Sequence, residues 1–193
     1  MHRVVRFLPG IAALLGSGAA SAHVGVHSAG DFAAGFTHPF LGLDHLLAMV
    51  AVGIWAVQLG GRYVLAVPLL FVTAVAAGAA VAVSGGTIPG VESGIALSVL
   101  ALGLLVAFSM RAARYWAIPL VAAFALAHGY AHGAEMPAFA LGWHFLAGVL
   151  AATATLHALG IGAGAALKER QPLVRVGGAA ISVFGGCLLL FPA

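Results

Sequence analysis

Two histidines, a carboxylate and a thioether lie within one apolar stretch, HPFLGLDHLLAM, which covers residues 38–49. An ionisable group at membrane depth costs roughly 2.5–3.5 kcal/mol, so such a cluster in an apolar segment indicates a function. His45 and Met49 are four residues apart and share a helix face, whereas Asp44 points about 100° away from His45. Imidazole, carboxylate and thioether groups together suit divalent or soft transition-metal ions better than Mg²⁺ or Ca²⁺. The stretch therefore predicts a metal-binding site.

The position of His38 relative to this site depends on local helix geometry. In an unbroken helix, seven residues separate His38 from His45 by about 10.5 Å, which is too far for one ion. Pro39 and Gly42 lie between them, and these residue types let a helix start late, kink or unwind. We expect a loosened first turn that brings His38 towards Asp44 and His45.

A second stretch, FALAHGYAHGAE, carries a pair of histidines and a carboxylate. His128 and His132 are four residues apart, so their side chains share a helix face about 6 Å from each other. That spacing lets two imidazoles bind one ion, and Glu135 extends the same face. Gly129 and Gly133 leave room beside the pair for another helix or for the path of an ion.

The composition indicates the class of protein that holds these stretches. Apolar residues make up 63 % of the chain and charged residues 7 %, against about 45–50 % and 25 % in soluble proteins. Six apolar segments are each long enough to cross about 30 Å of hydrocarbon as a helix. They cover residues 38–59, 63–83, 91–110, 115–132, 141–167 and 174–191. We predict an all-α integral membrane protein, a six-transmembrane-helix bundle whose partner is the lipid bilayer.

Glycines at four-residue spacing within the segments predict close helix contacts. They are Gly90 with Gly94, Gly129 with Gly133, and Gly160 with Gly164.

The first 22 residues resemble a secretory leader. A basic start, a short apolar core and the Ala20-Ser21-Ala22 cleavage signal follow one another, as in signal peptides. The alternative, a permanent first transmembrane helix, needs about 20 apolar residues. We therefore divide the chain into a signal peptide, 1–22, and one six-helix transmembrane domain, 23–193. Cleavage would make His23 the mature N-terminus, where its amine and imidazole, with His27, are candidate metal ligands.

Basic and non-basic connections alternate between the predicted helices. The loops with Arg62, with Arg111 and Arg114, and with Lys168, Arg170 and Arg175 would all be cytoplasmic, as the positive-inside rule requires. Both mature termini are then periplasmic. The polar groups of four helices fall in the outer half of the membrane, which adds Glu92 and His144 to the candidate ligands. His157 lies about 19.5 Å deeper than His144, where it serves either as an inner relay or as a hydrogen-bonding partner.

Three further features of the sequence exclude several classes of function. The net charge is +3, but the basic residues form no patch, so no nucleic-acid partner is expected. One cysteine, Cys187, allows neither a disulfide framework nor a thiolate cluster. No nucleotide-binding G-x-x-x-x-G-K-[ST] motif is present. We expect no enzyme and no permanently bound cofactor.

The two polar stretches resemble those of a known family. HPFLGLDHLLAM is similar to the H-P-x-x-G-x-D-H-x-x-x-M motif of the HupE/UreJ family, and FALAHGYAHGAE resembles its second motif. The resemblance covers the whole chain and implies a permease of the bacterial inner membrane. It implies uptake of nickel, or next cobalt, for hydrogenases, ureases or cobalamin synthesis. By motif position it implies metal contacts at His38, Asp44, His45, Met49, His128, His132 and Glu135.

Other readings stay open on the sequence alone. The donor types also permit copper or zinc. Paired histidines serve as haem ligands in membrane electron-transfer subunits, for example His128 with His144, although Asp44 and Glu135 then have no role. A metal sensor or chaperone that binds without transporting is a further alternative. A homo-oligomer is left open.

Overall fold

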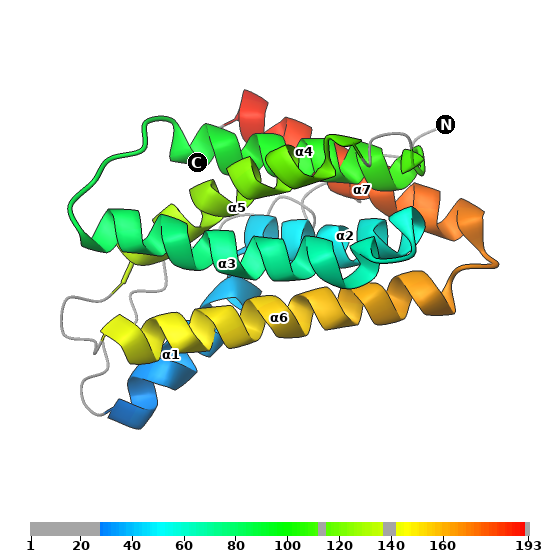
Figure 1. Cartoon of the computed structure of the whole chain (residues 1–193). Helices are drawn as coiled ribbons and strands as arrows, with labels where there is room; N and C mark the ends of the chain where they lie inside the picture. Colours follow the sequence, from blue (N-terminus) through cyan, green and yellow to red (C-terminus); the bar gives the residue numbers. More distant parts are fainter. Residues whose placement is uncertain (1–27, 112–114, 137–141, 192–193) are drawn as a thin grey trace, which may run out of the picture.

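The structure is a computed structural model that describes residues 28–111, 115–136 and 142–191, and in these ranges every regular element is a helix (Figure 1). The helices are α1 (Ser28–Leu41), α2 (Leu43–Leu59), α3 (Tyr63–Val83), α4 (Val91–Ala107), α5 (Ala117–Ala134), α6 (Gly142–Ala166) and α7 (Gln171–Leu190). The predicted all-α class is confirmed. The predicted leader, with His23 and His27, lies outside the described residues.

Helix length and composition identify a protein that spans the membrane several times. Four helices, α3, α5, α6 and α7, are long and apolar enough to cross a membrane, and the bent pair α1 and α2 adds a fifth if it counts as one span. Helix α4 is apolar but 17 residues long. Helices α2 to α7 follow the six predicted apolar segments in order, and the number of six crossings stays a prediction.

The prediction that the first apolar segment begins at residue 38 is wrong, because α1 ends at Leu41 and α2 begins at Leu43. The chain breaks at Gly42, whose φ of −88° and ψ of 112° are extended, and α1 and α2 meet there at a bend of 81°. Helix α1 was not predicted. It packs against the first turns of α6 (Figure 1), where Gly35 lies on the backbone of Phe145 and Gly148 on that of Phe32. The absence of two Cβ atoms lets these helices approach closely.

Helix α2 supplies the centre of the core. It packs against α3, α4 and α6, and its side chains Met49 and Trp55 are completely buried. The other contacts also depend on glycines. Gly129 of α5 lies against the backbone of α3, and Gly160 of α6 against that of α2.

The outcome of the predicted glycine spacings differs between the three pairs. Gly133 and Gly164 are also in contact with neighbouring helices, so two of the pairs are confirmed as packing positions. The third is only partly so, because Gly90 has open space around its Cα and caps α4 with a φ of +72°. The room beside His128 and His132 is thus occupied by helix α3.

A pair of glycines on α6 tests the closeness of this packing. Gly160→Ala should lower the thermal stability, because the added Cβ would overlap the Val50 carbonyl oxygen, and overpacking costs about 1–3 kcal/mol. Gly162→Ala is the matched control, because nothing lies within 4 Å of its Cβ position. It should keep or raise the melting temperature, since alanine is the better helix former. Equal melting temperatures of the two variants in detergent would contradict the close contact of α2 and α6.

Candidate metal site

The break at Gly42 brings the polar residues of the first stretch together. The ring centroids of His38 and His45 are 6.4 Å apart, much closer than in a continuous helix, so the expected loosened turn is confirmed. A Cβ atom on Gly42 would lie 2.9 Å from Asp44 Oδ1 and 3.2 Å from His45 Nδ1. Glycine at this position therefore makes room for the two side chains that follow it.

Asp44 and His45 form a hydrogen-bonded pair at the start of α2. Asp44 Oδ1 accepts from the His45 backbone N–H at 2.7 Å and from His45 Nδ1 at 2.8 Å. A carboxylate can only accept, so Nδ1 carries the proton and Nε2 carries the lone pair. His45 Nε2 is buried and has no hydrogen-bond partner among the described residues. This is the geometry by which a carboxylate orients a metal-binding histidine.

Helix α5 places two more imidazoles against His45. The ring centroid of His45 is 4.5 Å from that of His132 and 5.0 Å from that of His128. His128 Nδ1 donates to the Phe124 carbonyl oxygen at 2.9 Å, which leaves Nε2 as the lone-pair nitrogen. We call His45, His128 and His132 the buried trio.

Four of the six ring nitrogens of the buried trio lack partners in the part of the chain that the structure describes. His45 Nε2, His128 Nε2 and both ring nitrogens of His132 are buried without a hydrogen bond to any described residue. A buried polar group left unpaired costs about 1–3 kcal/mol, and native structures contain few of them. Neutral imidazoles with inward lone pairs are the commonest protein ligands of transition metals, so the donor set fits such an ion.

A second donor group lies at the edge of the trio. His38, His132 and Glu135 have ligand atoms that all lie within 4.8 Å of one another, and we call them the rim group. His38 Nε2 is 2.8 Å from Glu135 Oε2. This hydrogen bond lowers the pKa of the Glu135 carboxyl, so Glu135 is a carboxylate at neutral pH. His132 belongs to both groups and connects the exposed rim with the buried trio.

Three other predicted ligands have surroundings of a different kind. Met49 is buried in the apolar core, Glu92 is exposed in the first turn of α4, and the His144 ring stacks on Trp143 at 3.4 Å. None of the three belongs to the rim group, and their role as ligands stays a prediction.

One residue of the site has no sequence signal. Phe71 of α3 lies in an uninterrupted apolar run, yet its ring centroid is 5.6 Å from that of His128. His128 is completely buried between Phe71 and His45. A porphyrin bound to His128 would have to displace both rings, so this geometry favours a metal ion over the haem alternative.

Comparisons with known proteins agree over nearly the whole chain. The protein family described as HupE / UreJ protein matches residues 11–188. The chain is similar to Protein HupE of Rhizobium leguminosarum bv. viciae, with 46% identity over 182 residues, which cover 93% of this chain and 95% of that protein. No solved structure matches the chain. The family match includes both polar stretches.

Replacement of His132 tests whether its nitrogens are unpaired. His132→Leu should raise the thermal stability of the metal-free protein, because it removes two unpartnered buried nitrogens at about 1–3 kcal/mol each. His38→Leu is the comparison, and it should give no gain because it leaves Glu135 without its hydrogen-bonding partner. Melting temperatures in detergent with a chelator present measure both. A loss of stability in His132→Leu would mean that its imidazole makes stabilising contacts.

Proposed function

The chain belongs to the HupE/UreJ family, which is associated with nickel and cobalt uptake, and on that basis we propose that it carries Ni²⁺, or next Co²⁺, across the bacterial inner membrane. The observation that carries this proposal is the buried trio, with its four unpartnered imidazole nitrogens. The ion is the substrate of the protein. Donor type alone would also admit Cu²⁺ or Zn²⁺, and affinity would favour Cu²⁺, so the choice of nickel rests on the family.

The rim group receives the ion in this proposal. Glu135 and His38 are hydrogen-bonded to each other, and each can exchange that partner for a cation. The charge of Glu135 offsets part of the cost of removing water from the ion. His132 then transfers the ion inwards. Its ring centroid is 5.2 Å from that of His38 and 4.5 Å from that of His45, so it contacts both residues.

The buried trio holds the dehydrated ion. Three imidazoles supply neutral donors, and Asp44 supplies negative charge through its hydrogen bond to His45. We therefore assign Asp44 as the residue that orients and charges the His45 ligand. His23 and His27, which lie outside the described residues, would collect the ion before it reaches the rim. Import at an inside-negative potential gains about 4.6 kcal/mol per 100 mV for a divalent cation, twice the single-charge value.

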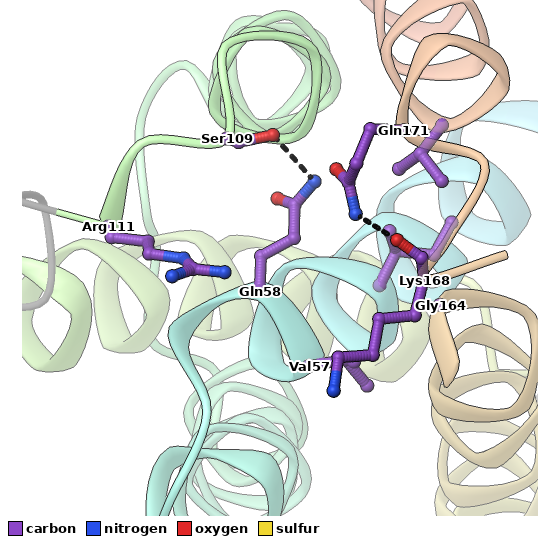
Figure 2. Close-up of a pocket in the computed structure, with 9 residues that line it drawn as sticks. Val57, Gln58, Ser109, Arg111, Gly164, Lys168 and Gln171 are labelled. Atoms are coloured by element: carbon purple, nitrogen blue, oxygen red, sulfur yellow. Dashed lines mark hydrogen bonds between the residues drawn. The ribbon is translucent and has the colours of Figure 1, made fainter. Parts of the chain in front are cut away.

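The distribution of charge supports an orientation with the rim group outside. The Lys and Arg residues in the described ranges, Arg62, Arg111, Lys168, Arg170 and Arg175, lie beyond the far ends of α2, α4 and α6 or at the start of α7. Figure 2 shows Arg111 and Lys168 on either side of Gln58 in a cleft at that end. Gln58 Nε2 donates to the Val106 carbonyl oxygen there at 3.0 Å. A basic end is typical of the cytoplasmic side.

The charge of Asp44 is the sharpest test of the function. Asp44→Asn keeps the size of the side chain and an acceptor for His45, but it removes the negative charge. Nickel uptake into proteoliposomes should fall by about 10–100-fold, the usual range for a lost carboxylate partner of a metal ligand. Glu169→Gln, an exposed change at the basic end, is the control and should transport normally. Wild-type rates in Asp44→Asn would contradict the assigned site.

The same assay separates transport from binding alone. If the protein is a sensor or chaperone, the purified wild type will bind Ni²⁺, but the vesicles that contain it will take up none.

The orientation gives a separate prediction. Reporter fusions after residue 193 should be active on the periplasmic side, and fusions after Arg62 or Lys168 on the cytoplasmic side, because basic connections stay inside. N-terminal sequencing of the mature protein should begin at His23. A cytoplasmic C-terminus would place the rim group on the wrong side for uptake.

A further inference from the structure

A histidine deep in the bundle is not part of the site described so far. His157 of α6 is 1% exposed, and both of its ring nitrogens lack a hydrogen bond to any described residue. Its position along the bundle follows from the contact between α6 and α2. Gly53 of α2 lies against the backbone of His157, where an added Cβ atom would overlap the His157 carbonyl oxygen. Gly53 is eight residues beyond His45, so His157 lies about 12 Å further along the bundle.

One aromatic ring connects His157 with the buried trio. The Phe71 ring centroid is 5.0 Å from that of His157, edge to face at 87°, and 5.6 Å from that of His128. Phe71 is completely buried. The Phe71 ring of α3 thus contacts two imidazoles, one on α5 and one on α6, and each of them has a buried nitrogen without a partner among the described residues.

Helix α3 contains a proline close to Phe71. Pro68 lies inside α3, three residues before Phe71. Proline cannot donate a hydrogen bond to the carbonyl four residues earlier, which weakens the helix at that turn. Apolar constrictions of this kind block hydrated ions until a side chain moves.

We propose that His157 is a second ligand position for the transported cation and that the Phe71 ring is the apolar gate between it and the buried trio. This inference rests on the proposed function. With the ring in place, a cation held by His128 has no polar path inwards. Rotation of Phe71 exposes a His157 nitrogen to the ion, which moves from imidazole to imidazole and then towards the basic end of the bundle. Return of the ring separates the two positions again.

The role of His157 is tested by measuring binding and transport separately. In His157→Phe, which fills the same space without a donor, the purified full-length protein should bind Ni²⁺ with a Kd within about twofold of the wild type, while uptake into proteoliposomes falls by about tenfold or more. Thr153→Ala is the matched control, because Thr153 is buried one turn away on α6 and its hydroxyl donates to the Val149 carbonyl oxygen within the same helix. It should retain both properties.

The contrary results are distinct. Normal uptake in His157→Phe, or loss of Ni²⁺ binding together with uptake, would overturn a separate inner position. A wild type that neither binds nor transports Ni²⁺ would instead overturn the proposed function.

The gate is tested by a graded series at Phe71. In vesicles loaded with Ni²⁺ and held at zero potential, Phe71→Ala should release the ion about tenfold faster than the wild type. Phe71→Val should be intermediate, and Phe71→Leu, which keeps an apolar plug, should remain tight. If the alanine variant is unstable, the release rates of Phe71→Val and Phe71→Leu can still be compared with that of the wild type. Equal leakage in Phe71→Val, Phe71→Leu and the wild type would overturn the gate.

Discussion

The hydrogen-bonded pair of Asp44 and His45 is the interaction on which the site depends. It exists because the chain breaks at Gly42, where a side chain would collide with both partners. The break gives α2 an N-terminal end of its own, and the positive end of the helix dipole stabilises a carboxylate there. A continuous helix through residues 38–59 would have exposed no backbone N–H to Asp44 and would have kept His38 away from His45. The break at Gly42 thus sets the position of His38, of the Asp44 carboxylate and of the His45 ring.

The other half of the site is held by packing. His128 and His132 project from α5, and on the same helix Gly129 and Gly133 lie against the backbone of α3. Side chains cannot separate two helices that touch through their backbones, so the spacing between α5 and α3 is fixed. The same contact places Phe71 beside His128. These two glycines are therefore structural, and they set the position of the two histidines.

Part of this arrangement could be predicted from the sequence. The apolar segments, the His128 and His132 pair and the approach of His38 to His45 follow from local spacing and from residue types that loosen helices. Helix α1 could not be predicted, because its packing partner Gly148 lies far along the chain. Phe71 gave no signal, since in a membrane protein both lipid-facing and core positions are apolar and helical periodicity disappears. The role of Asp44 in orienting His45 was also hidden, because adjacent residues on a helix ordinarily point apart.

The contact of α1 with α6 has a consequence for biogenesis. Helix α1 is synthesised first, but the surface that receives Gly35 belongs to α6 and leaves the ribosome only after four other helices. Until then α1 lacks its main packing partner and has only its smaller contact with α2, so that His38, near its C-terminal end, is not yet held beside Glu135. The rim group is completed late, after most of the bundle has been inserted. The candidate site is therefore complete only after the penultimate helix, α6, has been added.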